Sequence, residues 1–182
     1  MDNGASSYRR FLNGDDSAFE DLLDLYKDSL IFFLNRYVQN ITVAEDLAAD
    51  AFVELIVHRH RYRFENSLKT YLFMIGRSRA LNYLKREAKF GAAPLEMMSD
   101  AETGEDTEAL FLRDEEKREL HRALDQLPSD YRTALHLIYF AEMSYEEAGR
   151  VMRKNKKQID NLVTRGKNAL RSILKKDAVY EK

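Results

Sequence analysis

A segment of sixteen residues, RKNKKQIDNLVTRGKN at positions 153–168, combines many cations with side-chain amides. Six of its residues are Lys or Arg and one, Asp160, is acidic, although the whole chain carries a net charge of −2. Carboxamides such as those of Gln158 and Asn161 can bond adenine edges, and Lys or Arg can bond guanine or phosphate. The segment therefore has the chemistry of a surface that reads double-stranded DNA. The residues expected to make such contacts are Lys154, Lys156, Lys157, Gln158, Asn161, Arg165 and Lys167.

Helix caps predict how this segment is presented. Ser144 with Glu147 is a capping-box pattern, and Asn155 answered by Gln158 marks the start of a second helix after a short connection. Two short helices, a tight turn and a basic second helix describe a helix-turn-helix. With Ile159 and its apolar neighbours inward, the cations lie on the outer face, and the first turn of the second helix points into the major groove.

Lys156 and Lys157 lie at a helix start, where the helix dipole disfavours cations by about 0.3–1 kcal/mol each. An anionic partner accounts for that placement. Asp160 is the exception, and it either accepts from a cytosine amino group or pairs with a neighbouring cation. A basic amphipathic helix without a ligand is the plainer alternative. A membrane-surface helix is disfavoured because no bulky aromatic anchors flank the cations.

In the N-terminal half, aromatic residues are interleaved with cations between Arg59 and Lys89. Bases stack on aromatic faces while cations follow the phosphate backbone, which is how proteins hold single strands. Core packing is the competing explanation, and it is favoured for Tyr71 and Tyr83. Phe64 lies in a predicted loop, where it is available to a ligand.

Asp46, Asp50 and Glu54 are spaced four residues apart, so a helix would carry them as one acidic stripe. Like charges at this spacing cost a few tenths of a kcal/mol per pair. A basic surface that docks on the stripe would offset this cost, and a merely solvated face remains the alternative. Net charge alternates on a larger scale, at −4 for 42–57, +7 for 58–90, −8 for 95–116 and +9 for 150–176. Such blocks imply different partners for different segments.

Apolar spacing predicts an all-α fold of two small helical domains joined by a flexible acidic linker. The stretch from Gly91 to Glu108 contains glycine, proline and acids without apolar periodicity, which is typical of a linker. We expect a helical domain at 1–90, the linker at 91–110 and the helix-turn-helix domain at 111–182. The residues expected to cap the N-terminal helices are Asp15 or Asp16, Thr42 with Glu45, and Asn66 or Ser67.

The composition disfavours several classes of protein. The chain has no cysteine, so it has no disulfide, thiolate metal site or thiol nucleophile. No apolar run is long enough for a membrane span, and the start lacks a secretory signal, so we expect a cytoplasmic protein without membrane contact. No phosphate-binding glycine loop appears, and we expect neither a cofactor nor enzyme activity. An all-helical metal enzyme is an alternative, since Glu54, His58 and His60 form an E-x3-H-x-H pattern, although His60 points away from the other two.

Three stretches resemble the extracytoplasmic-function (ECF) sigma factors of bacterial RNA polymerase. They are AEDLAADAFVELI, SLKTYLFMIGRSRALNYLKRE, and LPSDYRTALHLIYFAEMSYEEAGRVM with a later ALR. The resemblance covers both predicted domains, about residues 15–90 and 110–175, in family order. It departs at four positions, because the family usually has Trp at Tyr71, Asn at Ser78, Ala at Gly149 and a turn glycine at Arg153.

The resemblance implies a promoter-selecting protein whose partners are core RNA polymerase and promoter DNA, with an anti-sigma protein as a further partner. It implies that the helix from Lys156 reads the minus-thirty-five element and that the acidic linker threads a basic polymerase channel. The residues implied for polymerase binding are Glu45, Asp46, Asp50, Phe52 and Glu54. Those implied for capture of the melted minus-ten element are Arg63, Phe64, Glu65, Asn66, Ser67, Lys69, Arg77, Arg79 and Asn82. The alternative is a helix-turn-helix regulator without core polymerase, which leaves the acidic stripe and the aromatic-basic segment unexplained.

Overall fold

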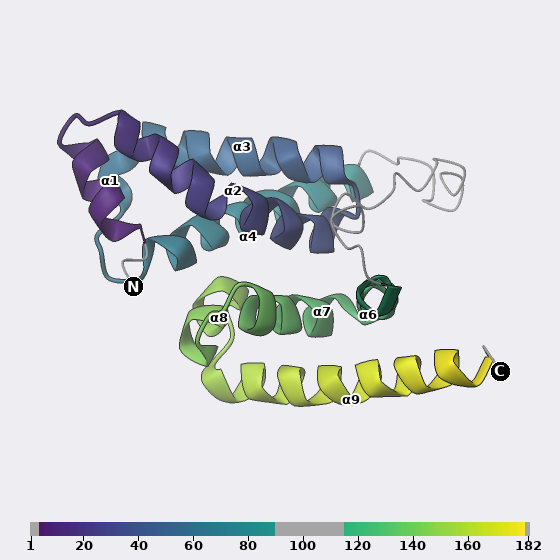
Figure 1. The fold of residues 1–182 in the computed structure, drawn as a ribbon. Coiled ribbons are helices and arrows are strands. Elements are labelled where there is room, and N and C mark those ends of the chain that lie inside the picture. Colours follow the sequence, from purple (N-terminus) through teal and green to yellow (C-terminus); the bar gives the residue numbers. More distant parts are fainter. Residues whose placement is uncertain (1–3, 90–114, 181–182) are drawn as a thin grey trace.

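The computed structural model describes residues 4–89 and 115–180, and every regular element in these ranges is helical. Figure 1 shows two layers, one from each half of the chain. The elements of the N-terminal half are α1 (Ala5–Leu12), α2 (Ser17–Val38), α3 (Ile41–Val57), the 3-10 turn η1 (Arg59–Arg61) and α4 (Leu68–Lys89). Those of the C-terminal half are α6 (Glu115–Asp125), α7 (Ser129–Leu135), the π-helical turn η3 (His136–Phe140), α8 (Tyr145–Met152) and α9 (Lys156–Tyr180).

In the N-terminal half, α2, α3 and α4 pack around a core of leucine, alanine and phenylalanine side chains. The α2 and α4 helices approach closely at Gly76, where an added Cβ would lie 3.0 Å from Leu30 Cδ1. The predicted cap at Ser67 is confirmed, since its hydroxyl accepts from the Thr70 N–H. The predicted cap at Thr42 is wrong, because α3 begins at Ile41 and Asn40 accepts from the Val43 N–H.

The α7 helix begins without a side-chain cap, whereas α8 and α9 begin at the predicted caps. Ser144 and Glu147 form the reciprocal capping box at α8. The turn between α8 and α9 passes through Arg153 at φ +55, the left-handed region in which glycine is ordinarily favoured. Gly149 lies beneath this turn, and a Cβ there would be 2.6 Å from the Lys154 carbonyl oxygen. The glycine at position 149 therefore makes room for this turn.

The two predicted helical domains are confirmed, and they pack against each other rather than standing apart. Buried side chains of both halves belong to one apolar cluster, in which Phe33 of α2 lies 6.0 Å from the ring of His136. Arg36, also on α2, is buried and pairs with Asp125 of α6 at 3.0 Å. The predicted linker at 91–110 lies outside the described residues. No helix in the described part of the chain is long and apolar enough to cross a bilayer.

Candidate nucleic-acid interface

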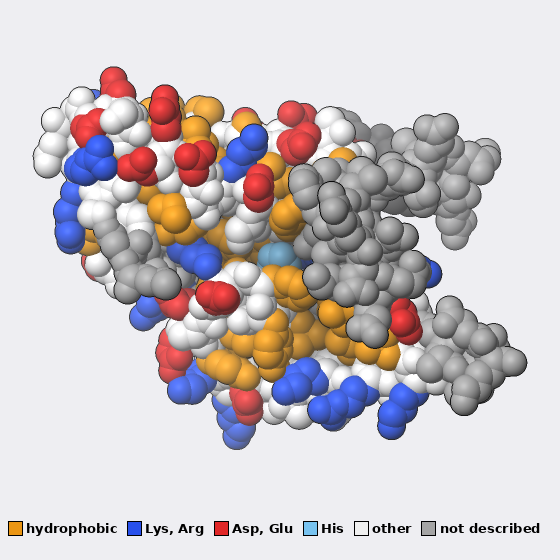
Figure 2. Space-filling model, viewed as in Figure 1, with side chains coloured by type: hydrophobic (Ala, Val, Ile, Leu, Met, Phe, Trp, Pro, Cys, Tyr) orange, Lys and Arg blue, Asp and Glu red, His pale blue; other side chains and the backbone are white. Residues whose placement is uncertain are grey.

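The first turns of α9 present the predicted duplex-reading residues on an exposed face. Asn155 caps the helix by accepting from the Gln158 N–H at 2.9 Å, and the Gln158 side chain accepts from the Asn155 N–H at 2.8 Å. Ile159 and Val163 are buried, which turns the opposite face outward. The exposed residues on that face are Lys156, Lys157, Gln158, Asn161, Arg165 and Lys167. In Figure 2, Lys and Arg side chains gather along the edge over α9.

These cations differ in their partners. Lys156 donates to Glu146 at 2.7 Å, which raises the pKa of Lys156 and lowers that of Glu146. Lys154 is half-buried and pairs with Asp130 at 3.2 Å, and Lys167 lies 5.7 Å from the centre of the Tyr139 ring. Lys157 and Arg165 form no ion pair with any residue that the structure describes. Within the first three turns of α9 they are therefore the two cations most available to a phosphate or a guanine.

The loop from Arg63 to Ser67 presents Phe64 at φ +58, a strained conformation for an aromatic residue. The Phe64 ring is 36% exposed and lies 4.6 Å from the Tyr62 ring. Tyr62 is buried and donates its hydroxyl to the Asn66 carbonyl at 2.5 Å, which closes the loop on itself. Arg63 and Glu65 are exposed on either side of Phe64. The loop thus holds one aromatic face at the surface, where a base can stack on it.

Two of the residues predicted to contact the minus-ten strand are bonded to the C-terminal half. Ser67 donates to a Glu147 carboxylate oxygen at 2.9 Å, and Thr70 also reaches Glu147. Lys69 donates to the backbone carbonyl of Ala141, and burial lowers the pKa of Lys69. Burial acts to raise the pKa of Glu147, but hydrogen bonds from Ser144, Ser67 and Thr70 outweigh it and the pKa is lowered. The start of α4 is therefore covered by α8 and the turn before it.

Farther along α4, the remaining predicted contacts have three different environments. Asn82 is exposed and Arg77 is half-buried. Arg79 pairs with Asp50 at 3.1 Å and with Glu54 at 2.9 Å, so it links α4 to the acidic stripe of α3. A residue predicted for DNA and two predicted for polymerase are thus bonded to one another.

The acidic stripe on α3 is exposed at Glu45, Asp46 and Asp50 and half-buried at Glu54. Phe52 is only 4% exposed and lies in the core, so in this structure it supports the helix instead of meeting a partner. Val53 and Val57 continue the line of Asp46 and Asp50 and are 54% and 66% exposed. These two valines were not among the predicted site residues, although their spacing on the helix face was visible in the sequence.

The α1 helix was not predicted from the sequence. Tyr8 is fully buried, and its ring contacts Tyr62 and Phe64 of the loop. The spacing of Tyr8, Phe11 and Leu12, at i, i+3 and i+4, is the amphipathic pattern that could have identified this helix. Among residues 4–89 and 115–180, no group of His, Asp and Glu side chains is arranged to hold a metal ion, so Glu54, His58 and His60 do not converge.

Family models and solved structures agree with this architecture. A model described as Sigma-70 region 2 matches residues 22–90, and one described as Sigma-70, region 4 matches residues 117–170. The RNA polymerase sigma-H factor of Pseudomonas aeruginosa is 29% identical and covers 91% of this chain and 90% of its own length. The ECF RNA polymerase sigma factor SigW of Bacillus subtilis is 26% identical over 89% of this chain and 91% of its own length.

Two solved structures share the fold. The sigma factor RpoE, in complex with the anti-sigma factor NepR from Bartonella quintana, matches with a TM-score of 0.63 and 23% identity over 86% of this chain and 96% of its own. CnrH, in complex with the cytosolic domain of CnrY, matches with a TM-score of 0.65 and 20% identity over 96% of each chain. Helical regions 2 and 4, in this order, define a sigma factor. The chain belongs to the ECF sigma factor family of bacterial RNA polymerase.

Proposed function

We propose that the protein directs bacterial RNA polymerase to its promoters by reading the minus-thirty-five element with the start of α9. The observation that carries this proposal is the exposed face on which Lys157, Asn161 and Arg165 lie without described acidic partners. An amide and two cations on the first turns of a capped helix suit the donors and acceptors of the major groove. Core RNA polymerase and promoter DNA are the partners.

The second part of the proposal concerns the minus-ten element, with Phe64 as the stacking surface. Extruding a base costs a few kcal/mol. Stacking it on an aromatic ring returns about 1–3 kcal/mol. Capture therefore roughly breaks even for each base, and it biases a bubble that polymerase contacts complete. Asn82 and Arg77 lie farther along α4, where they can contact the part of the single strand that extends beyond Phe64.

The third part concerns docking on polymerase through α3. Asp46 and Asp50 present carboxylates, and Val53 with Val57 adds an exposed apolar continuation on the same helix face. A partner surface with basic and apolar groups in the same order would satisfy both. Because the anti-sigma factor NepR is bound to RpoE, a sigma factor of similar structure, an anti-sigma protein is a further proposed partner of this chain.

Run-off transcription with core polymerase and a promoter library tests the proposal. Lys157→Ala and Arg165→Ala should each weaken promoter binding and lower the salt slope of binding by about one, because each removes a phosphate or base contact. Lys175→Ala is the matched control, since Lys175 is an exposed cation farther along the same helix.

Two outcomes would overturn the proposal. One is an unchanged salt slope and sequence preference in both variants. The other is specific promoter binding by the protein with no run-off product when core polymerase is present, as expected of a regulator that does not join the polymerase.

A further inference from the structure

The α1 helix precedes the residues matched by the region 2 model, which begins at residue 22. It nevertheless packs directly against the loop from Arg63 to Ser67, which is proposed to capture a base. The Tyr8 ring lies 5.5 Å from the Tyr62 ring, edge to face, and 6.3 Å from the Phe64 ring. The Tyr8 hydroxyl donates to the carbonyl of Arg59 at 2.9 Å and lies 3.3 Å from that of Leu55. One buried side chain thus joins the end of α3, the turn η1 and the loop.

Arg9, the next residue, contacts the same loop from outside. Its guanidinium carbon lies 4.7 Å from the centre of the Phe64 ring, in cation–π geometry, and its side chain is exposed. It forms no ion pair with the residues that the structure describes. An exposed, uncompensated cation therefore lies over the ring that is proposed to receive a base.

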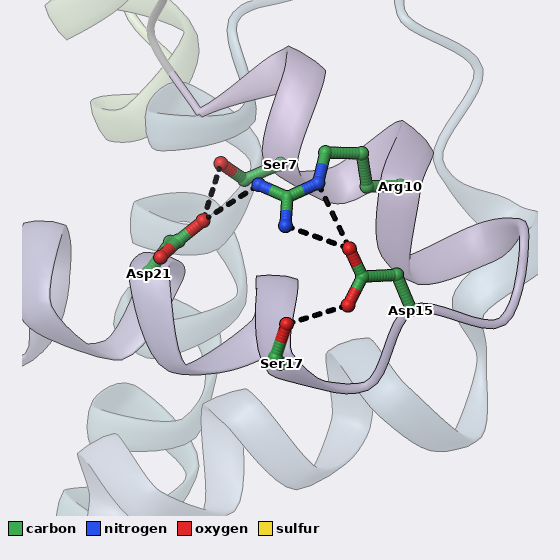
Figure 3. Close-up of polar contacts among 5 residues, drawn as sticks. All are labelled: Ser7, Arg10, Asp15, Ser17 and Asp21. Carbon is green, nitrogen blue, oxygen red and sulfur yellow. Dashed lines mark hydrogen bonds and ion pairs between the residues drawn. The ribbon is translucent and has the colours of Figure 1, made fainter.

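A network on the other side of α1 fixes the orientation of this helix (Figure 3). Arg10 donates to Asp15 at 2.6 and 2.9 Å and to Asp21 at 3.1 Å, and Ser7 also donates to Asp21. Successive residues of a helix point about 100° apart, so Arg10 faces α2 while Arg9 faces the loop. The two neighbouring arginines therefore differ: Arg10 holds α1 against α2, and Arg9 is available to a ligand.

The strained backbone at Phe64 gives α1 a further role. Residues held in the left-handed region persist when the surrounding structure over-determines them. The Tyr8 and Tyr62 rings against Phe64, together with the hydroxyl bonds of both tyrosines, supply that support. Without α1, one side of the Phe64 ring would lose its buried neighbour.

We propose that α1 completes the capture site for the melted strand, with Tyr8 as a positioning residue for the loop and Arg9 as a contact to the captured nucleotide. This inference rests on the proposed function of the loop. The ligand is a single-stranded nucleotide whose base stacks on Phe64 and whose phosphate, or the π-face of whose base, meets the Arg9 guanidinium. Arginine suits this task because it stacks on rings and pairs with phosphate at the same time.

The test uses holoenzyme and a promoter that carries 2-aminopurine at the captured position, whose fluorescence rises when the base leaves the stack. Arg9→Ala should lower the open-complex equilibrium about two- to fivefold, as expected for loss of an exposed cation–π contact. It should also lower the salt slope of single-strand binding by about 0.7. Arg9→Lys should keep the salt slope and lose part of the capture, because it keeps the charge without the planar group.

Tyr8→Phe keeps the ring and removes the two hydroxyl contacts. It should reduce discrimination between the preferred and the other bases at the captured position, while core binding and duplex minus-thirty-five binding stay unchanged. Lys27→Ala, which removes an exposed cation from α2, is the charge control and should behave as the unaltered protein. Melting temperatures of all variants are measured alongside, so that loss of folding is separated from loss of capture.

The outcomes separate this inference from the proposed function. If the unaltered holoenzyme gives no fluorescence rise at any minus-ten position, the proposed function of the loop fails. If it captures the base and Arg9→Ala captures it equally at the same salt slope, α1 takes no part in contacting the strand. Unchanged base discrimination in Tyr8→Phe would remove the positioning role.

Discussion

On α9, Lys157, Asn161 and Arg165 are exposed and are held by no described side chain. By contrast, Ser67, which caps α4, and Lys69 and Arg79 on α4 are each bonded to another element. Both surfaces were predicted to bind DNA from similar mixtures of polar and basic residues. The difference is that the α9 face points away from the rest of the molecule, while α4 lies in the seam between the two halves. The surface proposed to read duplex DNA is therefore exposed in the isolated chain, whereas the surface proposed to hold a single strand would first have to exchange its partners.

The seam is polar where it covers α4, and this makes the exchange possible. Glu147 and the Ala141 carbonyl are hydrogen-bond acceptors, as are phosphates and base edges, so DNA can replace them without leaving a donor unsatisfied. Changes at the seam should therefore alter the behaviour of α4 and leave α9 unaffected.

The largest effect is expected from Arg36→Met. Arg36 is buried, pairs with Asp125 at 3.0 Å and donates to His121 Nδ1 at 3.2 Å, so its removal takes two hydrogen bonds away from the seam. Hydrogen bonds to charged groups contribute about 1.5–3 kcal/mol, and Asp125 keeps its second pair with Arg132 at 3.6 Å. Urea unfolding should show this loss, and the distance between labels on α3 and α9 should increase. Arg10→Met, at an exposed pair, should leave both measurements nearly unchanged, and equal behaviour of the two variants would contradict the seam's dependence on Arg36.

A smaller effect is expected from acid. His136 is fully buried beside Phe33 and Phe140, neither ring nitrogen has a described hydrogen-bond partner, and burial followed by repulsion from Arg36, His121 and Lys69 lowers its pKa to about 3. The folded state thus binds fewer protons than the unfolded state, whose histidine has a pKa near 6.5. The contribution of neutral His136 to the free energy of unfolding is fully present above pH 6.5 and is lost as the pH falls towards 3. The loss between pH 7.5 and 5.5 is about 1.4 kcal/mol.

The measurement is urea unfolding at these two pH values, with His136→Leu as the comparison. The described groups that face His136 are Arg36 from α2, Lys69 from α4 and His121 from α6. Carboxylates contribute little above pH 5.5, and the variant retains the other histidines. An equal loss of stability in the variant would show that another group carries the dependence.

The smallest effect is expected from Glu147→Gln. Glutamine can still cap α8, so the change mainly replaces charge-assisted bonds to Ser67 and Thr70 with neutral ones, at about 0.5–1 kcal/mol. Amide exchange at the start of α4 should become faster, and a single-stranded minus-ten oligonucleotide should bind the isolated protein more tightly. Glu146→Gln, whose partner Lys156 lies on α9, should change neither quantity. Tighter binding in the Glu146 variant as well would point to a general charge effect rather than a seam contact.

Features that depend on neighbours within one helix turn could be predicted from the sequence. The capping box at Ser144, the cap at Asn155 and the inward positions Ile159 and Val163 are present as expected, because caps and apolar spacing act over three or four residues. The cap at Thr42 was misplaced because Asn40, two residues earlier, is an equally good cap. The contribution of α1 was not predicted because a short helix is stabilised mainly by tertiary packing, which the local sequence pattern does not show.

The amino-acid sequence was enough to predict that the chain is helical and that the helix after Asn155 carries an exposed basic face. These properties depend on residue type and spacing along one helix. The folded structure was needed to show that Ser67 and Lys69 meet α8 and the turn before it, that Arg79 bonds Asp50 and Glu54, and that Tyr8 supports Phe64. Those partners lie from 25 to 80 residues apart in the chain, and their meeting depends on how the halves bury their shared apolar surface.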